Sequence, residues 1–219
     1  MSPFLRLAAA TAPMQAELLA IPFVQDGIAG RWSREEYLAF LTQAYHHVKH
    51  TTPLLMACGS RIPESHEWLR DAMAEYIEEE VGHQRWILED IRNCGGDVAA
   101  AIAQGPSFAN EMMISYAYDI IQRQRPCGFL GMVNVLEGTS VRAATQAAEN
   151  LGRQLGLGKN CFSYLSSHGS LDLKHIDFFA SLVERLDSES DLEFVIHCSK
   201  NFFRLYGDIF REHQARFRG

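Results

Sequence analysis

The chain has 219 residues, of which 47% are hydrophobic and 21% charged, so it can bury a sizeable core and should not be disordered. Its formal net charge of −7, with no lysine- or arginine-rich run, argues against a nucleic-acid partner, because phosphate binding needs a basic surface. Neither a signal peptide nor a run of about 18 apolar residues is present, so we expect a soluble cytoplasmic protein without a membrane segment.

The cysteines indicate a reducing environment. They are odd in number and widely scattered, and no two form a Cys-x-x-Cys pair, which argues against a disulfide framework and a zinc–thiolate site. We expect buried free thiols at Cys58, Cys94, Cys127, Cys161 and Cys198.

Helical signals recur along the chain, and strand signals are nearly absent. Ser33 and Glu36 form a capping box that opens a helix through residues 43–50, and Pro53 should kink or divide this helix. Further helices are expected over residues 63–93, 105–125, 129–155, about 170–186, and from after the turn at 187–191 to about 213. Seven or eight helices with short connections predict an all-α bundle, organised as one domain over residues 1–219.

The segment HGSLDLKH at residues 168–175 is the first candidate for chemistry. If it is helical, His168, Asp172 and His175 share one face, because positions i, i+4 and i+7 lie within about 60° of one another. Two imidazoles and a carboxylate are good ligands for a transition metal. The plainer interpretation is a helix start with an acidic residue and two ordinary histidines.

The segment EEEVGH at residues 78–83 is the second candidate. Glu80 and His83 have the i, i+3 spacing by which helical bundles bring a Glu and a His to one metal, and Glu79 is the alternative ligand. An acidic run in a helix is more often a solvated face. Gly82 favours a special role, because glycine inside a helix costs roughly 1 kcal/mol relative to alanine.

Glu137 is the third candidate, because it sits in a largely apolar helix. Burying a carboxylate there is costly unless it is paired or bound to a metal; a hydrogen-bonded structural glutamate is the alternative. Together the three segments offer three histidines and three carboxylates on separate helices, a mixture that fits Fe or Mn better than Mg, Ca or Zn.

Other polar residues could line a pocket or support the ligands. His46, His47 and His50 lie in YHHVKH, and Tyr76 lies seven residues before His83. A separate expectation is that the helix around Met112, Met113, Tyr116 and Tyr118 supplies an apolar pocket.

Four stretches make the sequence resemble the heme-oxygenase-like di-iron oxidases and oxygenases, a group of iron-containing redox enzymes related to pyrroloquinoline-quinone synthase and thiaminase II. They are QAYHHVKH at 43–50, EEEVGHQRWILEDI at 78–91, GMVNVLEGTS at 131–140 and YLSSHGSLDLKH at 164–175. The resemblance implies a heme-oxygenase-like (TenA/PqqC-like) bundle, O2 activation, and two Fe(II) ions bound by Glu80, His83, Glu137, His168, Asp172 and His175. Some members have a carboxylate where this chain has Tyr76, which leaves Glu79 or Glu80 to complete the set.

The resemblance implies an enzyme that acts on a small organic substrate. The alternatives are a metal-independent PqqC-like oxidase, a TenA-like protein, and a non-enzymatic binding protein with the same fold. A homodimer is compatible with the fold, because one face of a bundle can pair with its own copy.

Overall fold

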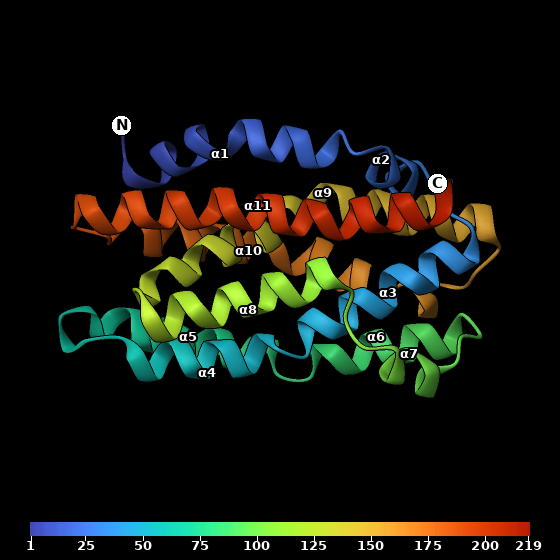
Figure 1. Cartoon of the computed structure of the whole chain (residues 1–219), viewed down its shortest axis with the longest axis horizontal. Coiled ribbons are helices and arrows are strands. Elements are labelled where there is room, and N and C mark those ends of the chain that lie inside the picture. Colours follow the sequence, from blue (N-terminus) through green and yellow to red (C-terminus); the bar gives the residue numbers. More distant parts are fainter.

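The computed structural model describes residues 1–138, 143–167 and 176–219, and every element in this part of the chain is helical. Figure 1 shows the longer helices running roughly along one axis, with the two termini at opposite ends of the molecule. The α-helices are α1 (Pro3–Leu19), α2 (Pro22–Ile28), α3 (Arg34–Val48), α4 (Thr51–Arg61), α5 (Glu67–Glu80), α6 (His83–Asn93), α7 (Val98–Gln104), α8 (Phe108–Arg123), α9 (Leu130–Leu155), α10 (Ser163–Glu184) and α11 (Glu189–Arg218). Short 3₁₀ turns precede α5, α9 and α10.

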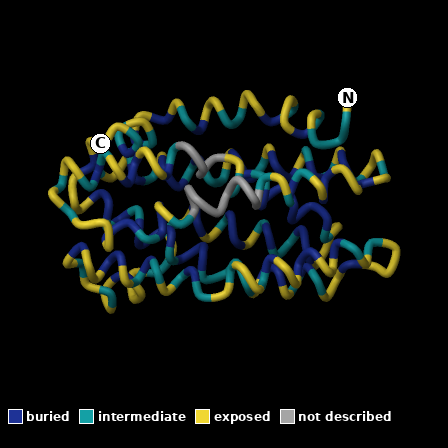
Figure 2. The backbone as a smooth tube through the Cα atoms, turned by 180° about the vertical axis from the view of Figure 1, so that it is seen from behind, coloured by how far each residue is buried: buried dark blue, intermediate teal, exposed yellow. Residues whose placement is uncertain are grey.

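The helices pack as a bundle around α9, α10 and α11. α9 lies against α10 and α11, while α1 and α8 cover other sides of α11 (Figure 1). α4 packs on α5 and α8, and α3 packs on α6. Buried residues face the interior of this arrangement and exposed ones the outside (Figure 2), so the core is formed by the apolar stripes of the helices.

The sequence signals for helix ends are largely confirmed. The capping box is present, with the Glu36 amide donating to Ser33 Oγ at 3.2 Å and the Ser33 amide donating to Glu36 Oε2 at 2.7 Å. Ser107 caps α8. Gly156 ends α9 with φ +64°, the left-handed conformation that glycine adopts most easily.

Seven or eight helices was too low an expectation, because several predicted helices are divided. The segment expected as one helix over 63–93 breaks between α5 and α6, where Gly82 has φ +99°. Gly82 is therefore not inside a helix, and its conformation suits glycine alone. The division before α4 falls at Lys49–His50 and not at Pro53. Pro53 stands in the first turn of α4, where a residue without a backbone N–H leaves no helical hydrogen bond unmade.

The helix expected over about 170–186 begins earlier, at Ser163. A side chain of α6 caps the first turn of α10. The side chain of Asp90, fully buried in α6, accepts the amide N–H of Ser163 at 2.9 Å and of Tyr164 at 2.8 Å. A carboxylate at this position also complements the positive end of the α10 dipole. The cap therefore fixes the start of α10 against α6.

All five cysteines are free and buried, as expected. Burial raises the pKa of Cys58, Cys94 and Cys127 to about 12 and that of Cys198 to about 11. These thiols stay protonated at neutral pH and act as small apolar side chains.

No single helix in the described residues is long and apolar enough to cross a membrane. α1 and α2 pass that test only as a pair, and they meet at a bend of 80°.

The close contact between α9 and α11 predicts opposite effects of one substitution at two glycines of α9. A Cβ at Gly131 would lie 2.7 Å from the Ser199 amide nitrogen, whereas one at Gly138 would meet nothing within 4 Å. We expect Gly131→Ala to lower the free energy of unfolding by about 2 kcal/mol through overpacking. Gly138→Ala should raise it by up to about 1 kcal/mol through helix propensity. Urea denaturation followed by circular dichroism measures both, and equal effects would contradict the close contact.

The Asp90 cap predicts a local and a global effect. Asp90→Ala leaves the Ser163 and Tyr164 amides buried without their acceptor, so it should destabilise the protein by about 2 kcal/mol. It should also accelerate hydrogen exchange at these two amides. The control is Asp97→Ala, which removes an exposed cap that accepts the Ala100 amide of α7. This change should cost at most about 1 kcal/mol and leave exchange in α10 unchanged.

Candidate functional site

Glu80 and His83 meet at the break between α5 and α6. Glu80 is the last residue of α5 and His83 the first of α6. Glu80 Oε2 lies 3.0 Å from His83 Nδ1, and His83 is buried although the intervening Val81 is 61% exposed. The Trp86 ring stacks on the imidazole with centroids 4.1 Å apart. The two residues therefore come together across a helix break and not along one helix, as the i, i+3 spacing had suggested.

Glu137 and Tyr76 lie on the same cavity as Glu80. Tyr76 is buried in α5, with its ring 5.1 Å from that of Phe178. Burial raises the pKa of Tyr76 well above its ordinary value, and the carboxylates of Glu137, Glu79 and Glu80 raise it further, with a hydrogen bond to Glu137 acting in the same direction. The Tyr76 phenol therefore stays protonated beside these carboxylates and can donate a hydrogen bond to Glu137.

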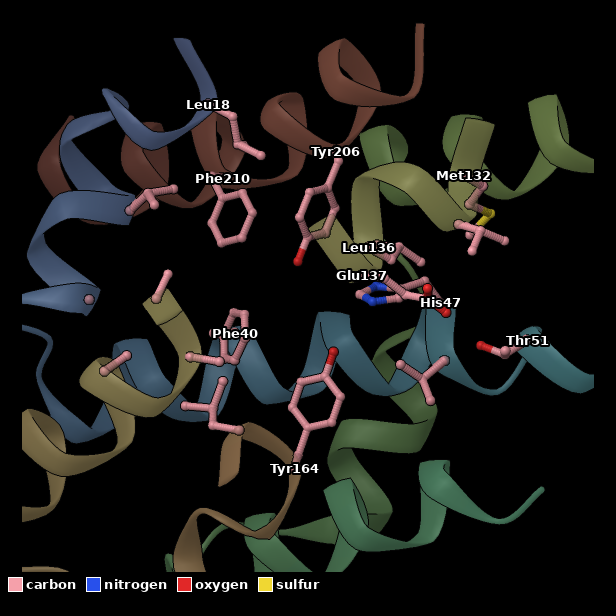
Figure 3. Close-up of a pocket in the computed structure, with 18 of the residues that line it drawn as sticks. Leu18, Phe40, His47, Thr51, Met132, Leu136, Glu137, Tyr164, Tyr206 and Phe210 are labelled. Atoms are coloured by element: carbon pink, nitrogen blue, oxygen red, sulfur yellow. The ribbon is translucent and has the colours of Figure 1, made fainter. Parts of the chain in front are cut away.

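A cavity of about 170 Å³ lies among these side chains. For comparison, an engineered apolar cavity of about 150 Å³ binds benzene. Figure 3 shows the hydroxyls of Tyr164 and Tyr206 pointing into it from opposite walls. Its polar lining consists of His47, Thr51, Tyr76, Glu80, Glu137, Tyr164 and Tyr206, and the rest is apolar or aromatic. Burial raises the pKa of Tyr206 to about 12, so this phenol is also neutral.

The three histidines of YHHVKH go to three different places. His47 lines the cavity, and its ring meets that of Tyr206 edge-on at 6.0 Å. Nε2 of His46 lies 3.0 Å from the Ala101 carbonyl oxygen, and Nδ1 of His50 lies 3.3 Å from the Tyr118 hydroxyl. Burial lowers the pKa of both His46 and His50. Of these three, only His47 is placed to contact a ligand in the cavity.

The structure brings part of the predicted metal set together. Glu80 pairs with His83 and lines the cavity with Glu137, which favours Glu80 over the exposed Glu79 as a ligand. Residues 168–175, which carry His168, Asp172 and His175, lie outside the described residues. Within residues 1–138, 143–167 and 176–219, no group of three or more His, Cys, Asp or Glu side chains is placed to hold a metal ion.

Several cavity residues were missed, and one expected pocket was wrong. The helix with Met112, Met113, Tyr116 and Tyr118 does not line the cavity. Its walls come instead from α1 to α5 and from α9, α10 and α11, and Figure 3 shows labelled residues of α1, α3, α4, α9, α10 and α11 around it. Tyr164 belongs to the stretch YLSSHGSLDLKH that carries the family resemblance. Nothing in the sequence near Thr51 or Tyr206 indicates a site, because only tertiary packing brings α4 and α11 to the cavity.

The model of one protein family matches residues 38–207, and its description is "Iron-containing redox enzyme". The chain belongs to this family. The match includes Glu80, His83 and Glu137, and it extends over the 168–175 segment. No curated protein matches the chain.

Solved structures show that this iron-containing redox enzyme family member has the heme oxygenase-like fold. One is a domain of unknown function with a heme oxygenase-like fold from Shewanella denitrificans OS217, with 22% identity, 97% of this chain and 92% of that chain covered, and a TM-score of 0.86. A TenA homologue from Pseudomonas syringae pv. tomato DC3000 has 10% identity, 97% and 92% covered, and a TM-score of 0.79. A heme oxygenase from Leptospira interrogans has 16% identity, 97% and 100% covered, and a TM-score of 0.72.

Proposed function

We propose that this protein is an O2-dependent non-heme di-iron oxidase or oxygenase that acts on a small organic substrate. The observation that carries the proposal is that Glu80, whose carboxylate lies 3.0 Å from the imidazole of His83, lines the same cavity as Glu137 in a chain of the iron-containing redox enzyme family. Imidazole and carboxylate donors together suit iron, and helical bundles use this combination for di-iron sites.

Glu80, His83 and Glu137 would supply part of such a centre, and the segment 168–175 would supply the rest. The two ions would be held by Glu80, His83, Glu137, His168, Asp172 and His175. Three carboxylates neutralise most of the four positive charges of two ferrous ions. Mn is the alternative metal with similar ligand preferences. When bound, ferrous iron supplies the electrons that reduce O2.

The surrounding residues would orient the ligands and exclude water. The Tyr76 phenol, neutral and beside three carboxylates, would donate a hydrogen bond to Glu137 and hold its carboxylate in place. Trp86, stacked on the His83 imidazole, would fix the plane of that ring. The apolar lining beyond Tyr164 and Tyr206 would keep bulk water from the substrate.

Iron loading tests the proposal directly. Anaerobic Fe(II) loading followed by desalting should leave about two iron ions per wild-type chain, measured by mass spectrometry of the metal content. His83→Ala and Glu137→Ala should each lose at least one ion, because metal affinity depends on every ligand. The matched controls are His197→Ala and Glu149→Ala, both exposed, which should bind iron as the wild type does.

Oxygen consumption by the iron-loaded protein then reports activity. We expect uptake of O2 by the wild type and the two control variants, and its loss in His83→Ala and Glu137→Ala. Screening small organic acids and amines for faster uptake would identify the substrate class. A wild-type protein that binds no iron after loading and consumes no O2 would refute the proposal.

A further inference from the structure

The cavity has two chemically different ends. His47 and Glu137 lie at one end and Phe40 at the other (Figure 3), and the ring of Trp32, which also lines the cavity, lies 5.2 Å from that of Phe40. α3 spans the distance between them, since Phe40 and His47 are seven residues apart, which is roughly 10 Å along a helix. Figure 3 shows Phe40 and Phe210 on one side of the cavity and His47 and Glu137 on the other, with the two tyrosines between. The cavity is therefore elongated, with the proposed reactive end at Glu137.

A continuous aromatic wall connects the two ends. The ring of Tyr206 lies 6.0 Å from that of His47 and 5.1 Å from that of Phe210. Phe210 lies 6.2 Å from Phe40, and Phe40 lies 5.2 Å from Trp32. All of these side chains line the cavity. Such a wall fits an apolar chain lying along it, because the Phe210 and Phe40 rings between Tyr206 and Trp32 carry no hydrogen-bonding group.

Trp32 cannot easily move out of the way. Its Nε1–H donates to the Phe23 carbonyl oxygen at 2.8 Å, and its ring stacks on that of Phe23 with centroids 4.8 Å apart. The six-membered ring of the indole rests on Gly27, where an added Cβ would lie only 2.5 Å from Cζ2. Trp32 is 5% exposed and the ring behind it, Phe23, is fully buried, so the indole closes this end of the cavity against the core.

We propose that Trp32 is the end wall that sets the length of the substrate, and that the substrate is an elongated, largely apolar molecule with its polar group toward Glu137 and His47. The assignment of the reactive end rests on the proposed function, whereas the length limit rests on the shape of the cavity alone. Trp32 is then a specificity-determining residue at the end of the cavity away from Glu137.

Straight-chain 1-alkanols of increasing length test the limit in metal-free protein kept in chelator, because their neutral head group needs no iron. Displacement of a fluorescent apolar dye from the cavity gives each dissociation constant. In the wild type, affinity should rise about fourfold for each added methylene that is buried, and stop rising at the length where the chain reaches Trp32. In Trp32→Leu the rise should continue at about fourfold per methylene beyond that length.

Two further variants keep the test decisive. Trp68→Leu makes the same change at a half-buried tryptophan that does not line the cavity, and it should keep the wild-type limit. Trp32→Phe keeps an aromatic ring on Phe23 and should extend the limit less than Trp32→Leu, which covers the case that Trp32→Leu fails to fold. An unchanged limit in the folded Trp32 variants, a wild type whose affinity rises without a limit, or no alkanol binding at all would overturn the proposal. Because no step involves iron, these results are independent of the outcome of iron loading.

Discussion

The contact between Asp90 and the first turn of α10 is the constraint on which the site depends. Asp90 is fully buried, and burial raises its pKa, although the amides of Ser163 and Tyr164 act in the opposite direction. A buried carboxylate of this kind is retained only where its hydrogen bonds are satisfied. Asp90 lies two helical turns after His83 on α6, so one helix both carries a proposed metal ligand and fixes the start of α10. The position of the Tyr164 hydroxyl in the cavity follows from this cap.

The helix break at Val81–Gly82 is the second constraint, and it acts on the other side of His83. A left-handed glycine at φ +99° lets α5 end at Glu80 and α6 begin at His83, so that the two helix ends bring a carboxylate and an imidazole together. Another residue at Gly82 would be strained, although nothing lies within 4 Å of its would-be Cβ. The glycine is therefore required by the backbone and not by packing. Between this break and the Asp90 cap, α6 has little freedom to rotate, and His83 is held against Glu80.

The sequence predicted local features better than features made by packing. Signals within a few residues predict the capping box at Ser33, the end of α9 at Gly156 and the all-α class. All three are present. The division before α4 was expected, although it lies at Lys49–His50 and not at Pro53. The division at Gly82 was missed, because a glycine in an apolar-periodic segment can be either inside a helix or at its end. Spacing identified Glu80 and His83 as a pair, but through an unbroken helix that the chain does not have. Thr51, Tyr206 and Trp32 were missed because only tertiary packing brings them to one cavity.

The chemistry proposed for the cavity places two opposing demands on the fold. A centre that reduces O2 needs carboxylates and imidazoles in a site from which water is excluded, and charged ligands are costly to bury. The chain separates these demands in space. Glu80 stands at a helix end that keeps 15% of its side chain exposed, where charge is tolerated, while aromatic rings continue the cavity into the core. An elongated cavity with one polar end is the natural result, since the proposed ligand Glu137 lies at one end and aromatic rings line the cavity beyond it. The end wall at Trp32 then limits what the polar end can act on.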